Sequence, residues 1–146
     1  MKVLECSSRG DKRFSAFYAK VSVFGKIDSI ESHYQSVKYK FDDKKYAKPC
    51  RKGERVDYLI INGKGLHARF LTPYYKLLWV KYLDNNPELV EYAKQFDSFN
   101  DMFKGRAINC QADVIREYVK QGREIIMNDP LVIEFINILK EDVDND

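Results

Sequence analysis

The chain has 146 residues, of which 45% are hydrophobic, 14% aromatic and 32% charged. Its length fits one domain with a sizeable core, and its apolar content excludes an intrinsically disordered chain. The longest apolar run, 131–139, is interrupted by Glu134 and Asn137 and is too short to span a bilayer. The chain does not open on a basic segment followed by an apolar stretch, so no secretory signal is expected. We predict a single domain over residues 1–146 with no membrane partner.

The cysteines and histidines limit the metal and redox chemistry that the chain can support. Cys6, Cys50 and Cys110 are widely spaced and odd in number, which excludes a disulfide framework and a CxxC zinc site. His33 and His67 do not have the spacing of a metal-binding pair. We expect reduced thiols in a cytoplasmic protein, and no structural metal. The sequence specifies no oligomeric state.

The net charge of +3 is unevenly distributed. Residues 38–55 contain eight Lys or Arg and three acids, whereas residues 134–146 contain five acids and one lysine. A basic segment of this kind can follow a phosphate backbone. A solvated surface loop is the more common interpretation of a single charge run, and both interpretations stay open.

The first predicted elements are two extended segments and a helix. Residues 3–8 and 16–25 are rich in apolar, aromatic and β-branched side chains, as strands are. A helix is then expected from a cap at Asp28 or Ser29 to about Lys40.

The middle of the chain predicts a hairpin followed by a helix. Residues 55–71 place two apolar runs around Asn62-Gly63, a dipeptide typical of tight hairpin turns. Thr72-Pro73 then opens a helix, with the threonine as its cap and the proline at the first helical position, where the missing N–H costs nothing.

The second half of the chain is expected to be helical. Asn86-Pro87 and Asp129-Pro130 repeat the pattern of a capping residue before proline, and Gly122 ends a helix. The last helix is apolar on most faces, so we expect it in the core. Together the elements predict a mainly helical α+β fold with a small β-hairpin or sheet. The helices expected after residue 70 are 72–83, 87–96, 110–121 (capped by Asn109) and 130–140, with a short helical turn at 98–103.

The segment 29–38, SIESHYQSVK, concentrates polar groups on one predicted helix. Glu31, Gln35 and Lys38 recur at helical spacing and form a polar stripe beside an apolar one, where they can line a cleft. His33 lies off both stripes and is expected to be exposed. The apolar stripe consists of Ile30, Tyr34, Val37 and Phe41.

Glu31 also has a structural interpretation. With Asp28 as the N-cap, Glu31 is the third residue of the helix, where its carboxylate would reach back to the backbone N–H of the cap in a capping box. Spacing alone favours this interpretation over a catalytic one.

Three blocks of the chain, 13–40, 81–96 and 100–109, follow the order and spacing of a known signature. The first block contains Phe-Ser-Ala-Phe, Gly-Lys and Ser-x-Glu-x-x-x-Gln-x-x-Lys. In these blocks the chain resembles the NADAR (YbiA-like) N-glycosidase family, which implies a YbiA-like multihelical domain. The matching residues are Phe14, Ser15, Phe17, Gly25, Lys26, Ser29, Glu31, Gln35, Lys38, Lys81, Tyr82, Glu88, Leu89, Asn100, Asp101, Gly105 and Asn109.

The chain departs from the family signature at several aromatic and polar positions. Ala16, Ser32 and Lys104 replace an asparagine, a histidine and a tryptophan of the signature. The family also has a functional tryptophan well before the second block, whereas Trp79 lies directly before it, at helical spacing with other apolar residues, and is expected in the core. The candidates for stacking on a base instead are Phe17, Tyr18 and Phe103, each of which also fits an ordinary packing role.

The resemblance implies hydrolysis of the N-glycosidic bond between ADP-ribose and a nucleobase, such as guanine in DNA, without a cofactor. Such a bond breaks through an oxocarbenium-like sugar, which needs a nearby anion, an attacking water and a proton for the base. Glu31 and Asp101 are the implied catalytic pair, with Glu31 at the water or the cationic sugar and Asp101 at the ribose or the leaving base, or the reverse. The implied substrate-binding residues are Phe17, Tyr18, Gln35, Lys38, Phe103, Gly105, Arg106 and Asn109.

Arg106 and Asp101 also fit ordinary structural roles. Lys38 and Arg106 would suit the phosphate oxygens of ADP-ribose, although Arg106 also fits a solvated surface position. Ser98-x-x-Asp101 is also a cap pattern for a short helical turn.

Two other functions stay open at this point. One is hydrolysis of a small ribosylamino-pyrimidine phosphate, and the other is a non-catalytic nucleic-acid-binding or protein-binding module. The departures at Ala16, Ser32 and Lys104 favour the second. By analogy alone, reversal of a DNA-modifying toxin would belong to a phage-defence or toxin–antitoxin system.

Overall fold

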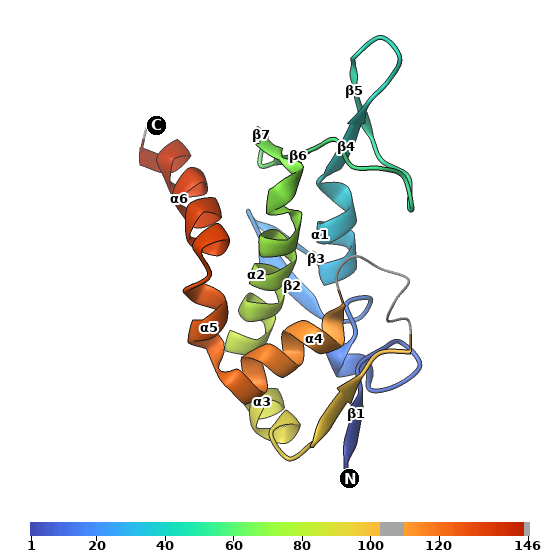
Figure 1. Cartoon of the computed structure of the whole chain (residues 1–146), viewed down its shortest axis with the longest axis vertical. Coiled ribbons are helices and arrows are strands. Elements are labelled where there is room, and N and C mark those ends of the chain that lie inside the picture. The colour runs from blue at the N-terminus through green and yellow to red at the C-terminus, as the bar shows by residue number, and fades with distance from the viewer. Residues whose placement is uncertain (103–109, 145–146) are drawn as a thin grey trace.

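The computed structural model describes residues 1–102 and 110–144, the last three as backbone only. It has the predicted mixed α+β fold in which helices dominate. Helix α2 (Leu71–Asp84) lies at the centre, with α1 (Ile30–Ser36) on one side and α6 (Pro130–Asp144) on the other (Figure 1). Buried apolar side chains from these helices and from the strands form one continuous core.

Helix α2 is central because it is apolar around most of its circumference. Trp79 is fully buried, as predicted, and its ring meets Tyr82 edge-on at 5.6 Å between centroids. The prediction that Thr72 caps this helix is wrong. The helix begins at Leu71, directly after a 3-10 turn, η2 (Ala68–Phe70), so Thr72 already lies inside it.

The first strand pairs with a segment from the far end of the chain. Strand β1 (Val3–Glu5) runs parallel to β8 (Ser98–Asn100), in the register Val3 to Ser98. The helical turn predicted at 98–103 is therefore wrong for its first three residues, because pairing with β1 supplies the backbone hydrogen bonds that a turn would otherwise make. This pairing ends at Asn100, which puts the next residue, Asp101, at the carboxyl end of the strand.

A hairpin leads into α1. Strands β2 (Lys20–Val23) and β3 (Lys26–Ser29) are antiparallel, and both residues of the turn have positive φ, 49° at Phe24 and 79° at Gly25. A two-residue turn of this kind matches the twist of the strands that it joins. The helix that follows is shorter than predicted.

Helix α1 ends at Ser36 because the chain then joins a sheet. Residues 38–41 form β4 (Lys38–Phe41), which pairs with β6 (Tyr58–Ile61) on one side and β5 (Ala47–Pro49) on the other. Phe41, expected in the buried stripe of a longer helix, is 52% exposed.

The four-stranded sheet has the order β5-β4-β6-β7. The hairpin between β6 and β7 (Lys64–His67) turns at Asn62 and Gly63, both with positive φ, as predicted. Strands β4 and β5 project beyond the helices (Figure 1). This projecting hairpin was not predicted, since its sequence is dominated by charged residues.

The remaining helices begin where the proline signals predict. Helix α3 (Pro87–Ala93) has proline at its first position, but the predicted side-chain cap by Asn86 is wrong, because its Nδ2 donates to the carbonyl of Tyr82 at 2.7 Å. Asp129 Oδ1 accepts from the backbone N of Leu131 at 2.8 Å to cap α6. The proposed cap Asn109 lies outside the described residues. The other helical segments are η1 (Lys12–Phe14), α4 (Gln111–Arg116), the π-turn Glu117–Gln121 and α5 (Arg123–Met127).

Helix α6 is not surrounded by the core, contrary to the prediction. Val132 and Phe135 are 1% exposed, and the Phe135 ring lies 5.8 Å from that of Phe70. Ile133, in contrast, is 43% exposed. The apolar residues of α6 therefore exceed the single face that packs on α2. Among the helices of the described residues, none has the length and apolarity needed to cross a membrane.

Gly122 allows the first test of this fold. It joins the π-turn to α5 with φ 100° and ψ 150°, a conformation that is essentially restricted to glycine. Gly122→Ala is expected to lower the free energy of unfolding by about 1–3 kcal/mol, measured by urea denaturation. Gly65→Ala is the control, because Gly65 lies in a strand with open space around its Cα. Equal stability of the two variants would contradict the backbone conformation described for Gly122.

Candidate functional site

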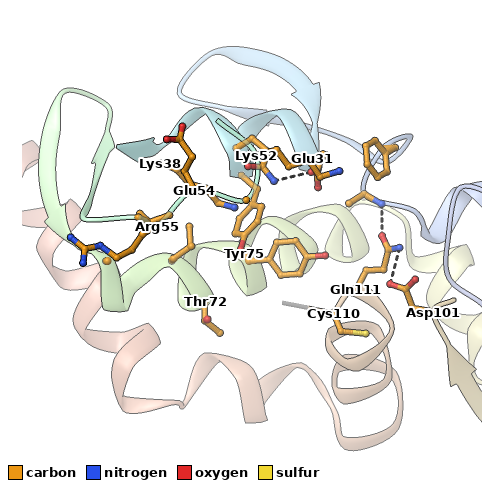
Figure 2. A pocket seen from close by; sticks show the side chains of 18 of the residues that line it. Glu31, Lys38, Lys52, Glu54, Arg55, Thr72, Tyr75, Asp101, Cys110 and Gln111 are labelled. Carbon is orange, nitrogen blue, oxygen red and sulfur yellow. Dashed lines mark hydrogen bonds between the residues drawn. The ribbon is translucent and has the colours of Figure 1, made fainter. Parts of the chain in front are cut away.

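One cleft of about 1090 Å³ collects most of the predicted site residues that the structure describes. Its walls come from α1, β4, the segment after β5, the start of α2, and residues around Asp101 and Gln111. Figure 2 shows Asp101, Gln111 and Cys110 at one end, Arg55 at the other, and Tyr75 between them. Segments far apart in the sequence thus form a single concave site.

Glu31 faces this cleft instead of closing a capping box. The cap is Ser29, whose Oγ accepts from the backbone N of Ser32 at 3.0 Å, so Glu31 is the second helical residue. Its Oε1 accepts from Nε2 of Gln35 at 2.9 Å, and its backbone N donates to the carbonyl of Ala16 at 2.9 Å. The predicted capping box is therefore wrong, because Asp28 is used elsewhere: it accepts from the backbone N of Ser29. The Glu31 carboxylate stays available in the cleft.

His33 is buried, not exposed as predicted. It is 6% exposed, and its Nε2 lies 2.9 Å from the carbonyl of Val21. The β2–β3 hairpin covers the face of α1 that the amphipathic pattern assigned to solvent. His33 does not line the cleft.

Asp101 lies at the opposite wall and is 7% exposed. Its Oδ2 accepts from Nε2 of Gln111 at 3.1 Å. The alternative of a helix cap by Ser98 is wrong, since Ser98 is in strand β8. The parallel pairing of β8 with β1 is what brings Asp101 to the cleft.

Gln111 joins three segments through one side-chain amide. Its Oε1 accepts from the backbone N of Ala16 at 2.7 Å, and its Nε2 donates to the carbonyl of Cys6 at 2.7 Å as well as to Asp101. Ala16 also carries the carbonyl that anchors Glu31. A continuous chain of hydrogen bonds therefore links the two carboxylate residues.

Gln111 was not predicted as a site residue, although the sequence carries a signal for it. In α4 it falls on the same face as Val114 and Ile115, and all three are buried. A glutamine on the buried face of an amphipathic helix needs hydrogen-bond partners for its whole amide group. Those partners lie far away in the sequence, so the spacing alone did not reveal them.

Aromatic rings form the wall between the two ends of the cleft. Tyr34 and Tyr75 meet edge-on at 4.8 Å between centroids, and the Nζ of Lys38 lies 4.0 Å from the centroid of the Tyr34 ring. Burial raises the pKa of the Tyr75 hydroxyl. Phe17, 52% exposed, lines the cleft as predicted. Tyr18 does not, and its ring instead faces the Nζ of Lys12.

Lys38 lines the cleft as predicted, but it lies in strand β4 and not on the polar stripe of a helix, where it was expected. Burial lowers the pKa of its ammonium, and the nearby Lys52 lowers it further, while Glu31 and Cys50 oppose this shift. Among the described residues Lys38 forms no ion pair, and its cation–π contact with Tyr34 stabilises the charge only in part. Lys38 is thus well placed to gain from an anionic ligand.

The cleft is basic toward its second end, but two of its arginines are already paired. Arg55 lies 2.8 Å from Asp57, and Arg69 lies 2.7 Å from Glu134. Lys52 is exposed and has no ion-pair partner in the described part of the chain. Of the cleft's cations, Lys38 and Lys52 are therefore the ones left for a ligand.

The structure brings together Glu31, Asp101, Phe17, Gln35 and Lys38 of the predicted site. Within the described residues there is no cluster of three or more His, Cys, Asp or Glu that could hold a metal. All three cysteines are free thiols. The predicted residues Phe103, Gly105, Arg106 and Asn109 lie outside the described residues.

In comparisons with known proteins, no family model and no curated protein matches the chain.

The role of Gln111 predicts a large loss of stability on substitution. Gln111→Leu would leave the buried N–H of Ala16 and the carbonyl of Cys6 without partners, which costs about 2–4 kcal/mol of unfolding free energy. Gln121→Leu, at an exposed position, is the matched control and should change stability little. Urea denaturation measures both. A Gln111→Leu variant as stable as the control would rule out that the Gln111 amide holds these segments together.

Proposed function

We propose that the chain is an N-glycosidase that releases ADP-ribose from a nucleobase, with ADP-ribosyl-guanine in DNA as the first candidate substrate. The observation that carries the proposal is that Glu31 and Asp101, each hydrogen-bonded by a glutamine amide, line one cleft together with an ammonium that has no ion pair among the described residues. The resemblance to NADAR N-glycosidases supports the same chemistry at the same two carboxylates. The free thiols suit a cytoplasmic setting.

Glu31 is the better suited of the two carboxylates to act at the reacting carbon. It is half-buried at the start of α1, and the single side-chain hydrogen bond from Gln35 fixes its orientation while leaving an oxygen for a water. The bond between the anomeric carbon of the ADP-ribose and the base nitrogen breaks with its electron pair passing to the base, while water attacks that carbon and gives a proton to Glu31. The base nitrogen takes up a proton from solvent. A carboxylate also stabilises the cationic sugar as it forms.

Asp101 is assigned to holding the ribose. It is almost fully buried, and Gln111 fixes one of its oxygens. A carboxylate in such a rigid position accepts hydrogen bonds from neighbouring hydroxyl groups, which orients the sugar for attack. Different surroundings thus give the two carboxylates different roles.

The rest of the cleft suits the remainder of ADP-ribose. Lys38 and Lys52 lie on the basic side and offer charge to a diphosphate. The exposed ring of Phe17 lies at the wall near Glu31 and can stack on a base. A volume of about 1090 Å³ is slightly larger than the usual range for small-molecule sites. This size favours ADP-ribose over a ribosylamino-pyrimidine phosphate.

Glu31→Gln tests the catalytic assignment. The substitution keeps the shape of the side chain but removes the base and the negative charge. Release of free ADP-ribose from an ADP-ribosylated guanine oligonucleotide should fall by about 10²–10⁴-fold. The thermal melting temperature should stay close to that of the unsubstituted chain.

Glu91→Gln is the matched control, because Glu91 is exposed on α3, away from the cleft. Persistent release by Glu31→Gln would refute the catalytic role. Hydrolysis of a ribosylamino-pyrimidine phosphate, with none of the modified oligonucleotide, would establish the smaller substrate. Activity on neither substrate would favour a binding module.

Lys38 predicts a pH dependence of ligand affinity. The folded-state pKa of its ammonium lies below the ordinary value of 10.5 because the group is buried, so its charge is lost earlier as the pH rises. Affinity for ADP-ribose should therefore begin to fall at a lower pH than an ordinary lysine would cause, and Lys38→Arg should flatten this fall because guanidinium stays charged. Isothermal titration calorimetry measures both. If affinity falls with pH in the same way for the unsubstituted chain and for Lys38→Arg, Lys38 does not bind the anion.

A further inference from the structure

The hairpin β4–β5 and the segment after it, residues 38–55, form a projecting basic arm beside the cleft (Figure 1). We propose that this basic arm binds the backbone of a single-stranded nucleic acid and leads one of its bases to Glu31. This inference rests on the proposed function, since it assigns a polynucleotide as the carrier of the modified base.

The basic arm carries charges that its own acids do not neutralise. Lys40 is paired with Glu54, and Arg55 with Asp57. The remaining exposed cations of the arm form no ion pair with any residue that the structure describes. They are Lys44, Lys45, Lys48, Arg51 and Lys52.

The register of the hairpin arranges these charges as a strip that ends in the cleft. Lys40 lies directly opposite Lys48, and Lys38 lies two residues before Lys40, so all three are on one face of the hairpin. Lys40 is neutralised by Glu54, so Lys48 and Lys38 are the cations of this face without an ion pair among the described residues. Lys38 lines the cleft, and so does Lys52 from the segment after β5. A chain of phosphates along this strip would neutralise these cations and end at the proposed active site.

The basic arm also carries exposed aromatic rings. Phe41 stacks on Tyr58 at 4.7 Å between centroids yet stays 52% exposed, and Tyr46 near the tip is 67% exposed. Exposed rings beside a strip of cations are the combination that single-strand-binding proteins use, because every base has a face that can stack.

Protection of a sheet edge is the ordinary explanation for this composition. Strand β5 is an edge strand, and Lys48 and Pro49 are residues that discourage pairing with another chain. Edge protection accounts for neither the exposed rings of Phe41 and Tyr46 nor Lys52 at the cleft. A nucleic-acid strand accounts for all of them.

A single strand fits better than a duplex. A base can reach Glu31 inside the cleft only when it is unstacked and turned away from its neighbours. In a single strand this exposure requires no base pair to break. The arm should therefore bind single strands more tightly than duplexes of the same length.

Fluorescence anisotropy with labelled oligothymidylate of about 20 nucleotides, longer than one site, tests the proposal on the full chain. Lys44→Glu with Lys48→Glu should weaken binding at least about tenfold and reduce the slope of log affinity against log salt by about 1.4. The matched control is Lys20→Glu with Lys140→Glu, which changes the net charge equally at exposed positions outside the arm. Tyr46→Ala, which leaves the charge unchanged, should weaken binding by about fivefold.

Three results would overturn the proposal: no binding at low salt, equal weakening by the arm and control variants, or tighter binding of a duplex. Failure of the proposed function is separate from these. If the chain binds oligothymidylate through the arm but releases no ADP-ribose, only the enzymatic assignment fails. If the arm binds nucleic acid and the chain releases ADP-ribose, the double variant Lys44→Glu with Lys48→Glu should cleave the modified oligonucleotide more slowly. Its cleavage of ADP-ribosyl-guanosine should be unchanged.

Discussion

The buried amide of Gln111 is the interaction on which the geometry of the cleft depends. It holds the backbone of Ala16 and of Cys6 and the carboxylate of Asp101 at once. Because Ala16 in turn anchors the backbone of Glu31, one side chain connects both walls. The strand pairing of β1 with β8 brings Asp101 within reach of that amide. Core packing around α2 then fixes the helix that carries Glu31.

Charges of opposite sign lie at different ends of the cleft. Two carboxylates lie at the end that Gln111 organises, while Lys38 and Lys52 lie toward the basic arm. Tyr34 and Tyr75 stand between these ends and keep Lys38 half-buried, which is why its pKa is lowered. Such an arrangement suits a ligand with a cationic reacting centre at one end and phosphates at the other. ADP-ribose linked to a base takes on this distribution of charge as its N-glycosidic bond breaks.

Local signals in the sequence predicted the helices, the Asn62-Gly63 hairpin and the buried Trp79, because caps, turns and periodicity act over a few residues. Sequence could not predict β8 or the early end of α1, because both depend on strands that are distant in the chain and offer hydrogen bonds. The same distance hid Gln111. Glu31 was predicted as a site residue by resemblance, although the capping geometry expected for it was wrong. His33 was misassigned because a hairpin covers the polar side of α1.

The central claim is that ADP-ribose binds between the two carboxylates, and a titration of the ¹⁵N-labelled chain with ADP-ribose tests it most directly by NMR. The account predicts that the largest shifts fall on the backbone amides of Ala16 and Glu31 and the side-chain amides of Gln35 and Gln111, with smaller shifts at Lys38. Shifts that cluster on a face away from this cleft, or none at millimolar ligand, would contradict it.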